Sequence, residues 1–213
     1  MFVLEQINIS YSKNKIIKHI DLQVHKGEVI GVLGKNGAGK TTLFNAIYQN
    51  IPYNGKILYQ NKPINRKNIS FLEAENYFYP YMTGREYLSF FGIEKNLENN
   101  IELIEKLQIP LDKFIHNYST GMKKKIAILA ILLMNKDIVI LDEPFNGVDY
   151  ESVNIIYEII RNLKNSNKII LLSSHIIETL FNTCDKIIVL ENGEITKTIP
   201  KTEFENLKKA TFI

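Results

Sequence analysis

The sequence is poor in cysteine, because Cys184 is the only one among 213 residues. A single cysteine excludes a disulfide framework within the chain and suits a reducing compartment. The sequence also lacks a strong excess of positive or negative charge: the formal net charge is +3, and acidic and basic residues are spread along the chain. No nucleic-acid-binding face is therefore indicated, and we expect no nucleic acid as a partner.

Long hydrophobic runs are missing as well. The longest apolar run, Ile126–Met134, is well short of the roughly 18–20 residues that span a bilayer. The segment Met1–Ser10 has neither a basic leader nor a long apolar stretch, so we expect no signal peptide. These absences predict a protein that is soluble by itself and needs a partner for any role at a membrane.

Hydrophobic residues make up 45% of the 213 residues, which is enough for a sizeable core. This size fits one domain, or one domain with a small lobe inserted. Short β-rich runs predict strands at Phe2–Ile9, Asp21–Val24, Glu28–Leu33, Lys56–Tyr59, Asn68–Leu72, Asp137–Leu141, Lys168–Ser173 and Asp185–Leu190. Helical periodicity predicts helices at Lys40–Tyr48, Arg85–Phe91, Leu97–Leu107, Met122–Met134, Glu151–Leu163 and Ile176–Phe181.

The alternation of these elements predicts an α/β fold over residues 1–213. Predicted strands such as Val29–Leu33 and Ile138–Leu141 are continuously apolar, as in a mostly parallel sheet that is covered on both faces. Asn192-Gly193 is a type I′ hairpin signal and predicts an antiparallel β addition. The stretch from about Glu73 to Leu133 has helix signals and no convincing strand, so we expect a helical subdomain inserted there, at about residues 73–133.

A glycine-rich run follows the predicted strand Glu28–Leu33. Its residues are Gly34, Lys35, Asn36, Gly37, Ala38, Gly39, Lys40, Thr41 and Thr42. The run fits the phosphate-loop pattern G-x-x-x-x-G-K-[ST], with a strand before it and a helix after it. Glycines let several backbone N–H groups converge on one anion, and the helix dipole adds positive charge. Lys40 can neutralise phosphate charge and Thr41 can ligate Mg²⁺. The alternative is a glycine-rich turn with no ligand.

Two acids, Asp142 and Glu143, end the apolar run that begins at Ile138. Successive side chains of a strand point in different directions, so the two acids can have different roles. Asp142 would hold Mg²⁺, directly or through water, and Glu143 would act as the catalytic general base on the attacking water. A pair of surface acids at a strand end is the alternative, and the phosphate loop makes the hydrolytic interpretation the better one.

Further segments extend these two motifs. Tyr118–Met122 is similar to the signature sequence LSGGQ, Asn146–Asp149 is similar to the D-loop, and Ser173–His175 is similar to the segment that carries a switch histidine. Tyr11 lies upstream of the phosphate loop, at the position where proteins with these motifs stack an aromatic ring on adenine. With all these elements in order from about Phe2 to Lys197, the chain resembles the nucleotide-binding domain of an ABC transporter.

The resemblance implies a subunit that binds ATP with Mg²⁺, forms a homo- or heterodimer of ATPase subunits around ATP, and drives an integral membrane permease. Tyr11 would stack on adenine, and His175 would contact the γ-phosphate as a catalytic switch. Ser119 and Gly121, which the signature retains, would act on the nucleotide of the other subunit, and Asp149 would couple the two sites. The subunit would be cytoplasmic and peripheral on the inner face of the membrane. The amino-acid sequence of these motifs is similar to that of bacterial export-type ATPases for drugs or peptides.

Other functions stay open as alternatives. A soluble ABC-type ATPase that acts on ribosomes or DNA usually carries two nucleotide domains or a long coiled-coil insertion, and this chain has neither. A non-hydrolysing, ATP-sensing scaffold is disfavoured because Glu143 and His175 are retained.

The chain departs from the family where a glutamine usually follows the strand Asn68–Leu72. Gapless alignment places Ala74 there, between Glu73 and Glu75. A shift of one residue would bring either glutamate to the metal, so the occupant of this position stays open.

Lys123, Lys124 and Lys125 fall in the first turn of a helix if Ser119 is its N-cap, which its residue type favours. Cations there oppose the helix dipole. A phosphate of the facing subunit could offset them, or their side chains could extend into solvent.

The run Tyr77–Met82 is rich in aromatic residues and precedes Thr83–Glu86, which fits a capping box. Aromatic and Met side chains are enriched in the cores of protein interfaces. The resemblance implies that a short helix of the permease docks here, and packing inside the helical subdomain is the alternative.

Overall fold

The computed structural model describes residues 1–12, 14–92 and 100–206. Its strands are β1 (Phe2–Tyr11), β2 (Asn14–Val24), β3 (Val29–Leu33), β4 (Asn54–Tyr59), β5 (Lys62–Pro63), β6 (Ile69–Leu72), β7 (Ile138–Asp142), β8 (Ile169–Ser174), β9 (Lys186–Glu191) and β10 (Glu194–Pro200). Its α-helices are α1 (Lys40–Ile47), α2 (Gly84–Phe90), α3 (Ile101–Lys106), α4 (Thr120–Leu133), α5 (Tyr150–Asn165) and α6 (Ile177–Thr183). The first residues of the predicted helix Leu97–Leu107 lie outside the described residues.

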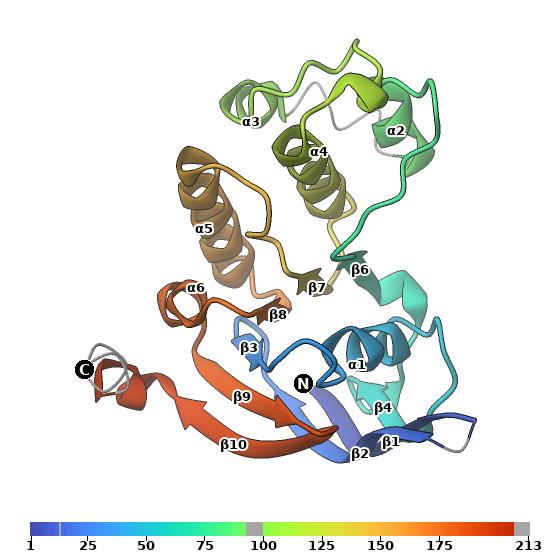
Figure 1. The fold of residues 1–213 in the computed structure, drawn as a ribbon, viewed down its shortest axis with the longest axis vertical. Helices are drawn as coiled ribbons and strands as arrows, with labels where there is room; N and C mark the ends of the chain where they lie inside the picture. The colour runs from blue at the N-terminus through green and yellow to red at the C-terminus, as the bar shows by residue number, and fades with distance from the viewer. Residues whose placement is uncertain (13, 93–99, 207–213) are drawn as a thin grey trace.

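The described strands form two sheets (Figure 1). The larger has the order β10-β9-β3-β8-β7-β6, in which β10 is antiparallel to β9 and the other neighbours are parallel. The smaller, β2-β1-β4-β5, is antiparallel throughout. The predicted α/β fold with a mostly parallel sheet is confirmed, and the antiparallel part includes a sheet of its own.

The central strands are continuously apolar because their two faces border different cores. Along β8, Ile169 and Leu171 belong to the core that includes α1 and the antiparallel sheet. Ile170 and Leu172 belong to the core that includes residues of α4, α5 and α6. Side chains alternate between the faces of a strand, so a sheet covered on both sides needs apolar residues at every position.

β2 begins at Asn14, well before the predicted start at Asp21. The prediction is wrong here because a β-bulge interrupts the alternation of apolar and polar residues. Relative to β1, β2 carries an additional residue between the buried Ile17 and Ile20. His19 lies in this interval with a φ of 51°. The extra residue moves the following side chains to the other face, which hides the strand period in the sequence.

The predicted hairpin between β9 and β10 is confirmed. Asn192 and Gly193 have φ values of 50° and 81°, as the two central residues of a type I′ turn require. The turn packs closely on β2, because an added Cβ at Gly193 would lie 2.0 Å from the Ile16 carbonyl oxygen. The Gly193 carbonyl also accepts a hydrogen bond of 2.8 Å from Lys18 N–H. The β9–β10 edge of the larger sheet is thereby joined to the smaller sheet.

Between β6 and β7 the described chain forms α2, α3 and α4, with no strand beyond an isolated bridge from Thr83 to Phe114. In Figure 1 these helices gather at the end of the molecule away from the antiparallel sheet. The predicted capping box is present: Thr83 accepts from Glu86 N–H, and the Glu86 carboxylate accepts from Thr83 N–H. No helix in the described part has the length and apolar character to cross a bilayer.

Ser70 on β6 is a buried polar residue whose side chain lacks a hydrogen-bond partner among the described residues. It is 0% exposed, and its hydroxyl is the one buried side-chain polar atom of the described residues that has no hydrogen-bond partner. A buried, unpaired hydroxyl costs about 1–3 kcal/mol of folding free energy. This strand position therefore lowers the stability of the chain.

We expect Ser70→Ala to raise the free energy of unfolding by about 1 kcal/mol, since it removes the unpaired hydroxyl with little change in shape. For a chain of this size the melting temperature would rise by about 2–4 °C. Ser152→Ala is the matched control, because Ser152 is 1% exposed but donates to Asp149, so its loss should lower the melting temperature. Thermal unfolding followed by circular dichroism measures both. A lower melting temperature for Ser70→Ala would contradict the prediction.

Candidate functional site

The loop between β3 and α1 borders a cavity of about 710 Å³. Gly37 and Gly39 in this loop have φ values of 83° and 106°, a region that glycine adopts without strain. Gly39 is the N-cap of α1, and no side chain caps the first N–H groups of that helix. The backbone donors and the positive end of the helix dipole suit an anionic group.

Most of the predicted site residues meet at this cavity. Its lining includes Tyr11, Lys35, Asn36, Gly37, Gly39, Lys40, Thr41, Thr42, Asp142, Glu143 and His175. Two residues of the glycine-rich loop are outside the lining: Gly34 contributes a carbonyl to Lys40, and Ala38 lines a smaller neighbouring hollow. Segments far apart in the sequence thus come together around one space.

The cavity lining also includes Ala74, which the alignment placed at the glutamine position, and two residues that sequence reasoning missed as site residues, Ile16 and Asn146. Ile16 is half-buried and lies in the part of β2 that was not predicted, close along the chain to Tyr11, which is 51% exposed. Tyr11 and Ile16 supply apolar surface to the cavity. The apolar pair that begins at Ile16, soon after Tyr11, is the signal that could have identified it.

Lys40 is held by the loop that precedes it. Its ammonium donates to the Gly34 carbonyl at 2.7 Å and to the Lys35 carbonyl at 3.4 Å. It also lies 3.9 Å from the Glu143 carboxylate, with the lysine side chain only 8% exposed. A buried ammonium at the cavity wall is well placed to pair with a negatively charged ligand.

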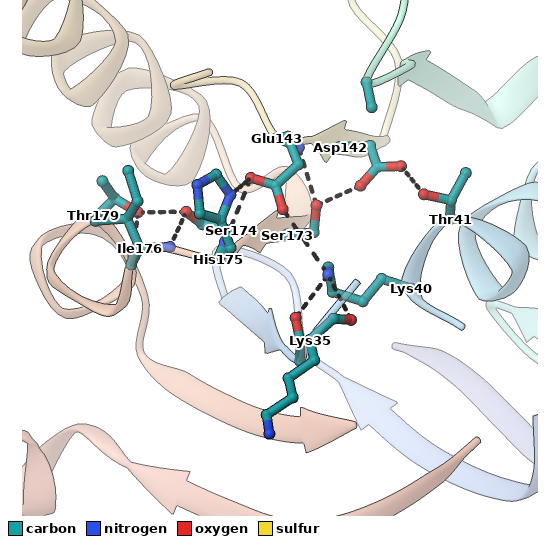
Figure 2. A network of polar contacts seen from close by, with 12 residues as sticks. Lys35, Lys40, Thr41, Asp142, Glu143, Ser173, Ser174, His175, Ile176 and Thr179 are labelled. Carbon is teal, nitrogen blue, oxygen red and sulfur yellow. Dashed lines mark hydrogen bonds and ion pairs between the residues drawn. The ribbon is translucent and has the colours of Figure 1, made fainter. Parts of the chain in front are cut away.

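The carboxylates of Asp142, the last residue of β7, and Glu143, the residue after it, have separate partners, as Figure 2 shows. Asp142 is 1% exposed; it accepts from the Thr41 hydroxyl at 2.6 Å through Oδ2 and from the Ser173 hydroxyl through Oδ1. Glu143 turns toward His175, whose Nδ1 lies 2.9 Å from Oε2. One carboxylate therefore faces the start of α1, and the other faces the loop after β8.

The Glu143 backbone explains this divergence in part. Its φ is 50°, in the left-handed region that residues other than glycine rarely adopt. Such backbone conformations persist where surrounding contacts enforce them, and they occur often at functional sites. Here the Glu143 N–H donates to the Ser173 hydroxyl at 2.9 Å.

With this geometry established, comparison with known proteins identifies the family. The sequence profile described as ABC transporter matches residues 17–146. The chain belongs to the ABC transporter family.

Individual relatives agree with this assignment. The ABC transporter ATP-binding protein NatA of Bacillus subtilis is 34% identical over 197 residues, which cover 85% of this chain and 80% of NatA. The linearmycin resistance ATP-binding protein LnrL of the same organism is 30% identical over 219 residues, which cover 95% of this chain and 70% of LnrL. The solved structure of CbiO1 from Clostridium perfringens, part of the ABC transporter complex CbiONQ, has a TM-score of 0.81 at 26% identity and covers 98% of this chain and 92% of CbiO1. The chain is an ATP-binding, ATP-hydrolysing subunit of ABC transporter type.

The ABC signature lies beside the D-loop in this chain. Of these two segments, only Asn146 at the start of the D-loop belongs to the cavity lining. Ser119 is the N-cap of α4, as predicted, and accepts from Met122 N–H at 3.2 Å. An added Cβ at Gly121 would lie 3.4 Å from the Gly147 carbonyl oxygen of the D-loop. Asp149 caps α5 through Ser152, and this hydrogen bonding holds the pKa of the Asp149 carboxyl below its usual value. Among the predicted site residues, Ser119, Gly121 and Asp149 are thus separated from the nucleotide cavity.

Tyr118 replaces the leucine that begins the usual ABC signature. It is 5% exposed, and its hydroxyl donates to the Pro110 carbonyl at 2.6 Å. Burial, followed by the charge of Asp112, raises the pKa of Tyr118 to about 12, so the phenol stays a neutral donor. The departure keeps an apolar ring in the core and adds an anchor to the segment before α4.

The lysines after the signature are not all in the first turn of α4. The helix begins at Thr120, so Lys124 and Lys125 belong to its second turn. Lys124 is 6% exposed and donates to the Ala74 carbonyl at 2.9 Å, and Lys125 lies 3.7 Å from Asp149. Burial lowers the pKa of Lys124, and the charges of Asp142 and Glu143 oppose that shift. Two of the three lysines therefore have partners within the chain, a backbone carbonyl for Lys124 and a carboxylate for Lys125.

The position of the usual glutamine is occupied by Ala74, which lines the nucleotide cavity as the gapless alignment predicts. Glu73 is exposed and close enough to Tyr87 to contribute, after burial, to raising its pKa to about 12. Glu75 lines an adjoining hollow with Lys124. Neither glutamate belongs to the lining of the nucleotide cavity.

We expect Lys40→Ala to weaken ATP binding at least about tenfold, because a hydrogen bond to a charged group contributes about 1.5–3 kcal/mol. Lys26→Ala is the matched control, since Lys26 is an exposed lysine outside the cavity lining. Isothermal titration calorimetry with ATP measures both affinities. Equal affinities for the wild type and Lys40→Ala would mean that ATP binds elsewhere.

Proposed function

We propose that this chain is the ATP-hydrolysing subunit of a bacterial export-type ABC transporter for drugs, peptides or similar substrates. The proposal is supported above all by Glu143, which lies at the nucleotide cavity between Lys40 and His175. The name of LnrL, which assigns that relative to linearmycin resistance, supports the export direction. We further infer that residues 1–213 act as one ATP-binding domain with a helical subdomain inserted at about residues 73–133.

Glu143 is the general base in this proposal. It would accept a proton from the water that attacks the terminal phosphate of ATP. Lys40 and the backbone donors of the glycine-rich loop would hold the phosphate charge in place. His175 is hydrogen-bonded to the Glu143 carboxylate through Nδ1, so it would orient that carboxylate. His175 would also contact the transferred phosphate. Tyr11 would stack on adenine at the apolar part of the cavity.

The residues at the end of β7 fit a magnesium ion. Asp142 is a nearly buried carboxylate whose described hydrogen-bond partners, Thr41 and Ser173, are neutral hydroxyls. Mg²⁺ prefers oxygen ligands and is usually bound through one or two carboxylates together with substrate phosphates. Thr41 and Asp142 would therefore hold Mg²⁺, directly or through water. The ion would neutralise charge on the phosphates of ATP.

Ser119, Gly121 and Asp149 support a dimer of ATPase subunits. These residues lie outside the lining of the chain's own nucleotide cavity, although the family pattern assigns them to the nucleotide. A second subunit, identical or paralogous, would bring its Ser119 and Gly121 to this cavity, with Asp149 linking the two sites. Lys123, in the first turn of α4, would then meet phosphate charge from the other subunit.

Glu143→Gln should preserve ATP binding and reduce ATP hydrolysis by at least about a hundredfold, because the amide keeps the shape of the side chain but cannot accept the proton. An ATP-bound dimer should accumulate, since the substitution also removes a negative charge. Phosphate release and size-exclusion chromatography with ATP measure the two effects. Glu203→Gln, an exposed position on a 3₁₀ turn, is the control. Normal turnover in Glu143→Gln would refute the assignment of the base.

An aromatic surface around Tyr77, Tyr79 and Tyr81 supports docking on a permease. These rings are 73%, 53% and 76% exposed. Their neighbours extend the surface, because Tyr79 contacts Phe90 and Tyr81 contacts Phe114. Large exposed apolar patches often mark interaction sites. We propose that a cytoplasmic helix of an integral membrane permease packs here and holds the subunit at the inner face of the membrane.

Phe78 differs from these neighbours, since it is half-buried and packs against the core and Tyr87. Tyr81→Ala should therefore weaken co-purification with the permease by at least about tenfold, within the range of interface anchors, and leave the melting temperature and ATP affinity of the isolated subunit unchanged. Phe78→Ala, the paired variant, should lower the melting temperature. Pull-down per folded molecule and thermal unfolding measure both. If Tyr81→Ala lowers the melting temperature and keeps partner affinity, these rings stabilise the subdomain and the docking proposal is wrong.

A further inference from the structure

Ser173 lies at the end of β8 and touches both acids of the ATP site (Figure 2). It is 0% exposed. Its hydroxyl donates to Asp142 Oδ1 and accepts from the Glu143 N–H at 2.9 Å. A serine hydroxyl has one hydrogen to donate, so the donation to Asp142 and the acceptance from Glu143 are compatible with each other. One buried group thus connects the two carboxylate-bearing residues.

The sheet places Ser173 where these contacts are possible. β7 and β8 are parallel neighbours, and Asp142 is paired with Ser173 in their register. The hydroxyl therefore reaches across one strand spacing to the last residue of β7 and to the first residue after it. Its position is set by the sheet rather than by a loop, so it is a rigid reference point for both acids.

Each contact has a specific effect on its acid. Ser173 occupies Oδ1 of Asp142, which leaves Oδ2 on the side of Thr41 at the cavity. The contact to the Glu143 N–H holds a backbone with a φ of 50°, which directs the Glu143 carboxylate toward His175. Removing the hydroxyl would free the Asp142 carboxylate to rotate and leave the Glu143 N–H without this partner.

We propose that Ser173 is a positioning residue for ATP hydrolysis, which orients Asp142 toward the magnesium site and fixes the backbone of Glu143. The proposal goes beyond the transport function, and its Asp142 part rests on the proposed magnesium site. Hydrogen bonds from groups behind metal ligands commonly change metal affinity or activity by about 10–100-fold.

Ser174 provides a matched comparison. It is the next residue, is 1% exposed, and lies on the same strand. Its hydroxyl accepts from the Ile176 N–H at 3.0 Å and from the Thr179 hydroxyl at 2.9 Å, at the start of α6. Its described hydrogen bonds therefore involve neither acid. Loss of this hydroxyl tests a general disturbance of the strand end without the specific effect.

The test compares the full-length wild type, Ser173→Ala and Ser174→Ala. A fluorescent non-hydrolysable ATP analogue is titrated into each protein, once with Mg²⁺ and once with EDTA. In Ser173→Ala we expect the gain in affinity due to Mg²⁺ to shrink by about 10–100-fold, with unchanged affinity in EDTA. The kcat for ATP at saturating Mg²⁺ should also fall, with a smaller change in KM. Ser174→Ala should keep the wild-type ratio of the two affinities.

The outcomes separate the possible errors. A wild-type chain with equal affinities in Mg²⁺ and EDTA would overturn both the magnesium site and this inference. A magnesium dependence that survives unchanged in Ser173→Ala, together with normal kcat, would overturn this inference alone. Equal losses in Ser173→Ala and Ser174→Ala would also overturn it, because the effect would then belong to the strand end in general.

Discussion

Parallel pairing of β3, β8 and β7 is the constraint on which the ATP site depends. Leu33 at the end of β3 is level with Ser174, and Asp142 at the end of β7 is level with Ser173. Parallel strands finish at the same edge of the sheet, so the segments after them emerge side by side. The glycine-rich loop, the two acids and His175 meet for this reason, although they are far apart in the sequence.

The same edge carries an unusual amount of buried charge. Asp142, Lys40 and Lys124 are 1%, 7% and 6% exposed. A buried charge is costly unless hydrogen bonds and counter-charges compensate it. Hydroxyls of Thr41 and Ser173 serve Asp142, while backbone carbonyls serve the two lysines. These neutral partners satisfy hydrogen bonds without cancelling charge, and the Glu143 carboxylate, 3.9 Å from Lys40, supplies a counter-charge. The site therefore holds fixed charges of both signs, which suit an ATP phosphate and a cation.

Contacts also connect the ATP site to the helical part of the chain. Lys124 on α4 donates to the carbonyl of Ala74, which lines the nucleotide cavity and lies three positions before Tyr77, the first residue of the aromatic run. Lys125, one residue further along α4, pairs with Asp149 of the D-loop. The proposed surfaces for ATP, for a second subunit and for a permease are therefore linked through α4.

The sequence alone was enough to predict the mixed fold, the phosphate loop and the two acids Asp142 and Glu143, because each depends on local chemistry. These predictions rest on glycines that permit positive φ, on apolar runs that fill two cores, and on an Asn-Gly turn. Each of these features can be recognised within a few consecutive residues. Most of β2 and, with it, Ile16 escaped prediction because the bulge near His19 breaks the local period.

Tertiary structure decided which groups meet. Sequence left the occupant of the glutamine position open, and the fold placed Ala74 rather than either neighbouring glutamate at the cavity. The fold also half-buries Phe78 against the core, whereas the neighbouring tyrosines stay exposed. It also brought Ser173 onto both acids, although Ser173 and Asp142 are 31 positions apart along the chain. Such contacts depend on strand register and on the packing of distant segments, and local sequence patterns carry no record of either.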